Sequence, residues 1–454
     1  QQLEQAQREM EQAIQELKSR GLRVVLYPFL LMDIPAASGK PNPYAPAEDQ
    51  PAFPWRGRIT VHPAPGVAGT PDKTATAATQ LAAFFGGATN AHFVTAGTRV
   101  TYSGPADWGY RRFVLHYAHL AKAAGGIDAF LIGTEMRGLT QVRSSATAYP
   151  AVAELQALAG DVRAVLGVGT KLSYAADWSE YACHRPGDGS GDVFFNLDPL
   201  WSDPNIDFIA VDFYAPLADW RDGPHLDAGD WPSIHDRAYL QANVEGGEDY
   251  DWFYASAAAR DAQDRTPIAD GAYGEPWIYR AKDVRAWWSN AHHDRPAGVR
   301  SASATGWVPQ SKPVWFTELG CPAVDKGANQ PYVFYDAKSS EGGFPVYSNG
   351  RRDDLIQRRY IEALLDYWSP ANGNNPVSAV YGAPMIDVAN AHAWAWDARP
   401  FPDLPLRTEI WRDAPNWAGG HWLTGRLGQL SLADLVTALC APVGIVPDVS
   451  GLNG

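Results

Sequence analysis

The sequence is poor in cysteine, in basic residues and in long apolar runs. Its 454 residues include 3 cysteines, and 37 lysines and arginines stand against 51 aspartates and glutamates, which gives a formal net charge of −14. No basic run is present that could neutralise phosphates, so we expect no nucleic-acid partner. No apolar stretch is long enough to span a bilayer, and the polar N-terminus is unlike a signal peptide, so we expect no membrane insertion.

Motifs of disulfide, metal and nucleotide chemistry are missing as well. The cysteines are far apart, odd in number and without CxxC or Cys/His spacing, which excludes a full disulfide framework. No GxGxxG or GxxxxGK[ST] motif follows a predicted strand, and no GxSxG elbow occurs. The acidic, glycine-rich segment 187–192 could bind calcium through its oxygens, although an ordinary loop is the simpler interpretation. We therefore predict neither a cofactor nor a metal.

What the sequence does contain is a high proportion of aromatic residues, with 18 Trp, 20 Tyr and 16 Phe in a chain that is 46% hydrophobic. Such side chains could simply fill a large core. Several tryptophans lie in segments rich in Pro, Gly and Asp, namely Trp108, Trp178, Trp201, Trp220, Trp231, Trp307 and Trp417. Loop tryptophans of this kind could instead serve as platforms for the apolar faces of sugar rings, and both interpretations stay open.

Predicted helices and strands alternate along the chain. The apolar periodicity predicts helices at 2–19, 72–85, 109–124, 150–166 and 353–368, with helical stretches near 235–262 and 281–291. Apolar runs predict strands at 22–32, 127–135, 170–177, 206–214, 313–319 and 391–397. This alternation indicates an α/β protein with a parallel sheet. The segments 34–108 and 215–312 interrupt the pattern, and we interpret them as long insertions.

Polar and aromatic residues gather at the C-terminal ends of these strands. They are Asp33, Glu135, Asp177, Asp212, Tyr214, Glu318, Trp396 and Asp397. Functional residues lie at those ends in a (β/α)₈ TIM barrel, whereas a doubly wound sheet concentrates its site at one switch point. We therefore predict a TIM barrel over 1–428, with 429–454 as the start of a following module or extension. Only six strands are found, so if Glu135 ends the fourth, the first two would lie before residue 1.

Two glutamates carry the predicted chemistry. Glu135 and Glu318 each close an apolar run, and each is followed by a glycine turn. Two carboxylates facing each other across a barrel mouth are what glycosidic bond cleavage needs, because one donates a proton and the other acts as nucleophile or base. By strand order we assign Glu135 as acid/base and Glu318 as nucleophile. The alternative is that each glutamate is a barrel-end residue paired with an arginine such as Arg137.

Further residues at the strand ends are predicted to contact the substrate. They are Asp33, Asp177, Trp178, Asp212, Tyr214, Trp394, Trp396 and Asp397. The aspartates after the middle strands and Tyr214 could hydrogen-bond sugar hydroxyls or orient Glu318, but an aspartate at a strand end is often only the cap of the next helix. The two tryptophans of the last strand alternate with alanine, so both side chains face the same way. They could floor a sugar subsite or belong to the barrel core.

Five segments of the chain resemble a known family. They read YPFLLMD at 27–33, PWRGRIT at 54–60, LIGTEMRGLT at 131–140, TELGCPAVDKGANQP at 317–331 and AWAWDARPF at 393–401. These segments are similar to the TIM-barrel-like domain of gene transfer agent and phage tail proteins, and the resemblance extends over nearly the whole chain. In that family the barrel is inserted in a large tail-tip or hub protein and is described as glycoside-hydrolase-like.

The resemblance implies a place, but it does not settle the activity. The place is the tail tip or baseplate of a phage-like particle, which is assembled in the cytoplasm and acts extracellularly on the recipient envelope, with other tail proteins as partners. From the two glutamates, taken with this place, we expect a retaining glycoside hydrolase that acts on a bacterial surface glycan or peptidoglycan. The alternative is a non-catalytic glycan-binding or structural barrel of the tail hub. The wider glycosidase superfamily usually carries Asn before the acid/base, where this chain has Thr134. That departure affects the expected contact to the sugar 2-hydroxyl rather than Glu135 itself.

Overall fold

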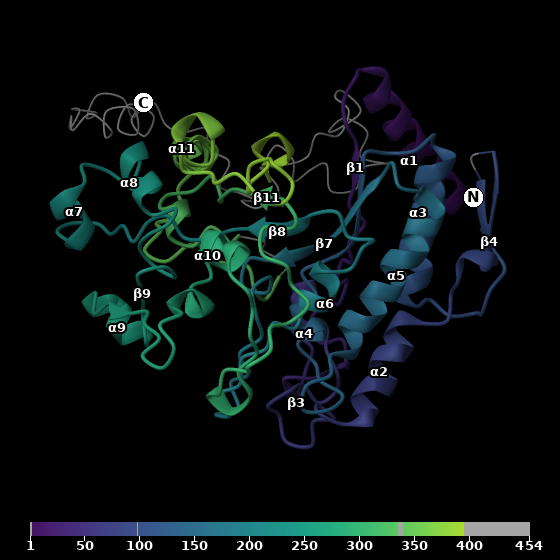
Figure 1. Ribbon diagram of the computed structural model, residues 1–454, viewed down its shortest axis with the longest axis horizontal. Coiled ribbons are helices and arrows are strands. Elements are labelled where there is room, and N and C mark those ends of the chain that lie inside the picture. Colours follow the sequence, from purple (N-terminus) through teal and green to yellow (C-terminus); the bar gives the residue numbers. More distant parts are fainter. Residues whose placement is uncertain (1, 98, 335–338, 395–454) are drawn as a thin grey trace. The chain divides into compact units, whose positions relative to one another are not determined.

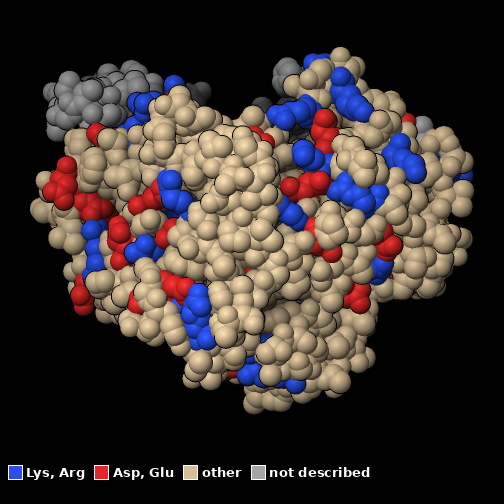
Figure 2. All heavy atoms as spheres, viewed as in Figure 1, with Lys and Arg blue, Asp and Glu red and all other residues tan. Residues whose placement is uncertain are grey.

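The chain forms two compact units in the computed structural model, which describes residues 2–97, 99–334 and 339–394 (Figure 1). Among the described residues, unit 1 comprises 2–211, 289–315 and 379–381, and unit 2 comprises 212–288, 316–378 and 382–394. Acidic and basic side chains are interspersed over the face seen in Figure 2. Within the described residues, no helix has both the length and the apolar character that a membrane span requires.

Unit 1 is built on a curled parallel sheet. The strands of this sheet are β1 (Val25–Leu26), β6 (Ala129–Thr134), β7 (Lys171–Asp177), β8 (Ile209–Phe213) and β11 (Val314–Leu319). The last residues of β8 and β11, from Asp212 and from Phe316 onward, belong to unit 2. Their order in the sheet is β1-β6-β7-β8-β11, which follows the order in the chain. A doubly wound sheet reverses its order at a switch point, and this sheet does not, so its winding is that of a barrel. The described residues supply five strands of the predicted eight and no closed barrel.

The strands form where the sequence is continuously apolar. Every residue of β6 and of β11 is buried, as expected for parallel strands covered on both faces. The register pairs Val25 with Ala129 and Phe130 with Leu172. On one face, Leu131 packs in a cluster with the stacked rings of Phe208 and Trp315, whose centroids lie 3.9 Å apart. Each such side chain contributes about 1.5–3 kcal/mol by leaving water.

The four longer helices of unit 1 lie where the apolar periodicity predicts them, whereas two helices of four residues each were not predicted. In chain order the helices are α1 (Gln2–Ser19), α2 (Ala75–Phe85), α3 (Tyr110–Ala123), α4 (Arg137–Thr140), α5 (Pro150–Leu166) and α6 (Asp198–Trp201). The ends of α5 follow from its sequence, because proline is favoured in the first turn and Gly167 adopts a positive φ of 76° just after the last turn. The 34–108 segment also holds two antiparallel pairs, β2 (Pro41–Asn42) with β3 (Ala45–Asp49) and β4 (Phe93–Ala96) with β5 (Arg99–Tyr102).

Unit 2 holds most of the second long segment. Its elements are α7 (Leu226–Asp230), α8 (Arg237–Ala242), β9 (Trp252–Phe253), α9 (Ala257–Ala262), β10 (Thr266–Pro267), α10 (Val284–Ser289) and α11 (Asp354–Tyr367). The predicted helical stretch 235–262 is wrong between α8 and α9. Gly247 and Asp249 there adopt positive φ angles of 70° and 62°, which a helix does not allow. The chain turns instead, and β9 pairs with β10.

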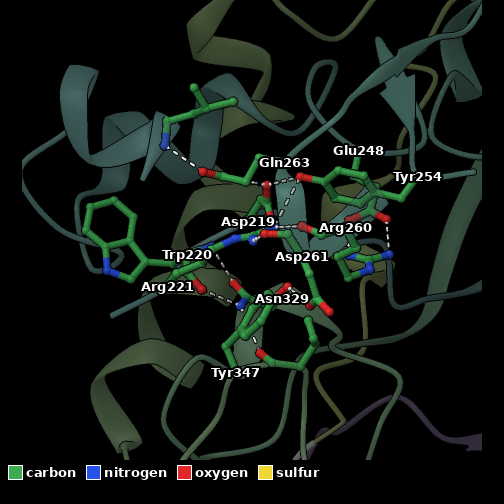
Figure 3. Close-up of polar contacts among 12 residues, drawn as sticks. Asp219, Trp220, Arg221, Glu248, Tyr254, Arg260, Asp261, Gln263, Asn329 and Tyr347 are labelled. Atoms are coloured by element: carbon green, nitrogen blue, oxygen red, sulfur yellow. Dashed lines mark hydrogen bonds and ion pairs between the residues drawn. The ribbon is translucent and has the colours of Figure 1, made fainter. Parts of the chain in front are cut away.

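A polar network centred on the buried Asp219 holds this segment together (Figure 3). The Asp219 carboxylate accepts hydrogen bonds from the Tyr254 hydroxyl at 2.6 Å and from Arg265 at 2.8 Å, and Arg221 lies 3.4 Å away. The Arg221 guanidinium also stacks over the Tyr347 ring at 4.4 Å. One carboxylate therefore joins parts of unit 2 that are far apart in the sequence.

The first and last predicted strands differ most from the structure. The run at 22–32 forms only the two residues of β1, because Pro28 has no N–H for a ladder. At the other end, Ala393 makes a single parallel bridge to Leu319, supported by the Trp394 N–H bond to the Leu319 carbonyl at 2.8 Å. The remainder of that predicted strand, 395–397, lies outside the described residues.

Candidate active site

Glu135 lies at the exit of β6 in a strained backbone conformation. Its φ is 47°, in the left-handed region that non-glycine residues avoid, and its N–H donates to the Ala175 carbonyl at 2.8 Å. The preceding Gly133 leaves no room for a side chain, because a Cβ there would lie 2.7 Å from the Tyr110 hydroxyl. Such strain is typical of functional sites, where the surrounding structure holds a residue in a conformation it would not otherwise adopt.

Two residues of the 34–108 segment hold the Glu135 carboxylate. Oε2 accepts a hydrogen bond from the Trp55 indole N–H at 2.8 Å and forms an ion pair with Arg56 at 2.7 Å. Arg137, the partner in the structural alternative, instead donates to the Ser179 hydroxyl. Glu135 is therefore paired with an arginine, as the alternative interpretation expects, but that arginine is Arg56 and not Arg137. The only sequence signal for Trp55 and Arg56 is that they belong to one of the family-like segments, 54–60.

Asp177 and Glu180 are two further buried acidic groups of unit 1. Burial, together with the charge of Glu135, raises the pKa of Asp177 to about 6, although two hydrogen bonds from Ser179 oppose the shift. Burial also raises the pKa of Glu180 to about 7, against hydrogen bonds from the Thr140 and Tyr174 hydroxyls. Carboxyl groups with raised pKa values that lie close together are characteristic of catalytic sites. Glu180 was not predicted, and its signal was only its place three residues after a strand-end aspartate.

Glu318 belongs to unit 2, as do Asp212 and Tyr214. The Glu318 carboxylate is buried and accepts a hydrogen bond of 2.5 Å from the Tyr214 hydroxyl, the residue predicted to orient it. Asp212 accepts a hydrogen bond of 2.7 Å from Thr317, and carboxylate oxygens of Asp212 and Glu318 lie within 4.8 Å of each other. The ends of β8 and β11 thus bring together three of the predicted site residues.

The other residues that the sequence predicts to contact the substrate do not share one environment. Asp33 is exposed and lies beyond β1, so the predicted strand end at this residue is wrong. Trp178 is buried. Trp394 follows the bridge to β11, and Trp396 and Asp397 lie outside the described residues.

The surroundings of several loop tryptophans and of the 187–192 segment are defined, whereas Trp417 lies outside the described residues. Trp201 and Trp307 are buried and serve the core, whereas Trp108 is 86% exposed with the Arg112 guanidinium 3.9 Å from its ring centroid. In the acidic loop, Asp188 and Asp192 lie 3.3 and 3.2 Å from the buried Arg143. Their carboxylates are engaged in ion pairs, which favours an ordinary loop over a calcium site.

These contacts place two glutamates in different surroundings. Glu135 is held by a cation and an indole N–H, and Glu318 is held by a phenol. Pairs of carboxyl groups in unlike environments are the usual basis for separate acid and nucleophile roles. Fold and site therefore define an α/β protein with a barrel-type sheet and buried acidic residues at the ends of its strands.

The chain belongs to the GTA TIM-barrel-like domain family, whose sequence model matches residues 108–405, and the predicted resemblance is confirmed. Two structures of a GH113 beta-1,4-mannanase, one of them a complex, each share 14% identity with this chain at a TM-score of 0.35, covering 80% of it. A GH113 beta-mannanase from Alicyclobacillus acidocaldarius, in complex with ManMIm, has 15% identity, a TM-score of 0.29 and coverage of 74%. The present chain covers 64% of the first two mannanases and 61% of the third. Comparison with curated proteins gives no match.

Proposed function

We propose that the chain is a retaining glycoside hydrolase that cleaves a bacterial cell-surface or cell-wall glycan as part of a phage-like tail. The observation that carries the proposal is a pair of buried strand-end glutamates, Glu135 held by Trp55 and Arg56, and Glu318 held by Tyr214. Membership of the gene transfer agent family supports the association with a tail. Other tail proteins would then be its partners, and the recipient envelope would be its place of action.

In the proposed reaction the two glutamates act together. Glu135 protonates the departing glycosidic oxygen while a carboxylate oxygen of Glu318 attacks the anomeric carbon and forms a glycosyl-enzyme. Glu135, now a carboxylate, takes a proton from water as that water attacks the anomeric carbon, which releases the sugar and restores both groups. Trp55 and Arg56 stabilise the carboxylate that Glu135 becomes after the first step. The Tyr214 hydroxyl holds the Glu318 carboxylate in a fixed orientation.

Hydrolysis of aryl glycosides and isolated envelope glycans by the wild type, Glu135→Gln and Glu318→Gln tests these roles. Loss of the acid/base costs about 10²–10⁴-fold in rate. For Glu135→Gln the loss should be large with poor leaving groups and small with good ones, which depart without a proton. Glu318→Gln should be slow with both kinds. Equal rates in all three proteins would contradict the proposed roles.

The same proposal can be tested by geometry. A crystal structure gives the separation of the Glu135 and Glu318 carboxyl groups, which is about 5–5.5 Å in a retaining glycosidase and about 6.5–9.5 Å in an inverting one. A separation within the first range would support the proposed mechanism. A separation well beyond about 10 Å would contradict any hydrolase assignment to this pair.

A second candidate is a non-catalytic glycan-binding or structural barrel of the tail hub. The ion pair between Glu135 and Arg56 favours it, because a proton donor has to leave such a pair during turnover. This alternative predicts that the wild type binds isolated envelope glycan in calorimetry without releasing reducing ends. It also predicts that Glu318→Gln binds the glycan with unchanged affinity.

A further inference from the structure

The strained turn at Glu135 is held from behind by a chain of hydrogen bonds. The Met136 N–H, next in the chain, donates to the Tyr174 hydroxyl at 2.7 Å, and that hydroxyl donates to Glu180 Oε1 at 2.9 Å. Tyr174 and Glu180 are both completely buried. Because the Tyr174 hydroxyl accepts one bond and donates the other, its orientation is fixed at both ends. The backbone after β6 is therefore linked to a carboxylate that itself follows β7.

Glu180 is also bonded to the backbone of β7. Its Oε2 accepts the Asp177 N–H at 3.2 Å, and its Oε1 accepts the Thr140 hydroxyl at 2.5 Å. Among the described residues no lysine, arginine or histidine forms an ion pair with it. Burying a carboxylate without a cation beside it costs free energy, and here only neutral hydrogen-bond donors offset that loss.

We propose that Glu180 is a positioning residue for the site, acting through Tyr174 on Glu135 and through the backbone on Asp177. Its carboxylate fixes the exits of β6 and β7 at once, so that the left-handed turn carries the Glu135 carboxylate to Trp55 and Arg56. The inference rests on the proposed function for its kinetic consequences. Its structural consequence, the fixed geometry of Glu135, does not depend on turnover.

The structure offers a matched pair of substitutions for the test. Tyr174→Phe and Thr140→Val each remove one buried hydroxyl that donates to the same oxygen of Glu180. Only the first breaks the link to Met136. If Glu180 were merely a structural group, the two variants would behave alike. Glu180→Gln is a third variant. The two carboxylate oxygens of Glu180 accept bonds from three donors, so the NH₂ group of the glutamine must face at least one donor and lose that bond.

The experiment combines kinetics with crystal structures of the full chain. Tyr174→Phe should lower kcat by about 10–100-fold with KM nearly unchanged, because a displacement of about 1 Å at the reacting groups has effects of this size. It should also release φ of Glu135 from its left-handed value and lengthen the bond between Trp55 and Glu135. Thr140→Val should change kcat by less than about 3-fold and leave Glu135 in place.

Equal losses of kcat in the two variants, or an unmoved Glu135 in the Tyr174→Phe crystal structure, would overturn the positioning role. A wild type that turns over no glycoside would refute the proposed function instead. In that case the Glu135 geometry in the variant structures still decides whether Glu180 holds the turn. Failure of the one proposal is thus distinguishable from failure of the other.

Discussion

Asp177→Asn should stabilise the folded protein at neutral pH. Asp177 is buried beside the charge of Glu135, and these two effects raise the pKa of its carboxyl from 3.8 to about 6. The asparagine oxygen can still accept the bonds that Oδ1 now receives from the Ser179 N–H and hydroxyl. The substitution therefore removes the buried charge and preserves the local turn.

The magnitude follows from the pKa shift. A rise of the pKa from 3.8 to about 6 corresponds to a free energy of about 3 kcal/mol. Because the pKa is raised in the folded state, the stability linked to this proton is fully present below pH 3.8 and is lost as the pH rises through about 6. We expect the variant and the wild type to be equally stable near pH 4. At pH 8 the variant should be more stable by up to about 3 kcal/mol.

Urea unfolding between pH 4 and pH 8 measures the difference directly. Asp33→Asn is the control, because Asp33 is exposed, and its effect should be small and independent of pH. If Asp177 serves the reaction, the stabilised variant should also lose kcat/KM. A difference between Asp177→Asn and the wild type that stays constant from pH 4 to pH 8 would refute the reasoning about the buried charge.

Two further predictions concern the ion pairs that support the site-bearing units. Arg143→Met should lower the free energy of unfolding in urea by about 2–4 kcal/mol, because three carboxylates lose the cation that they share. The control is Lys73→Met, which removes an exposed ion pair with Asp188 and should cost about 0–1 kcal/mol. Asp219→Asn should lower the free energy of unfolding by about 2–4 kcal/mol, because the partly buried Arg221 loses its charged partner. An unchanged melting temperature would contradict a stabilising role of Asp219 in unit 2.

The sequence carried enough local information to predict most of the sheet and its helices. The helix predicted at 150–166 coincides with α5, because proline and glycine mark its two ends. The parallel strands were found because burial on both faces makes each of them a continuous apolar run. The errors arose where backbone conformation overrode periodicity, as at Gly247 and Asp249, or where Pro28 ended a ladder after two residues.

The partners of the site residues were harder to predict than the residues themselves. Strand ends indicated Glu135 and Glu318, but Trp55 and Arg56 reach Glu135 from 80 and 79 positions earlier in the chain. They come from a segment whose sequence shows little periodicity. Glu180 lies in a turn after β7, where nothing in the local pattern distinguishes a buried carboxylate from an exposed one. Such contacts depend on the tertiary fold, so one sequence could not specify them.

The most direct test of the central claim is the rate at which Glu318→Gln releases reducing ends from isolated bacterial envelope glycan, relative to the wild type. Both proteins are assayed at equal concentration, after thermal unfolding has shown that their melting temperatures are the same. The proposed mechanism predicts measurable release by the wild type and a rate at least about 10³-fold lower for the variant, because the group that attacks the anomeric carbon is gone. Release by Glu318→Gln at the wild-type rate would contradict it, and so would a wild type that releases nothing.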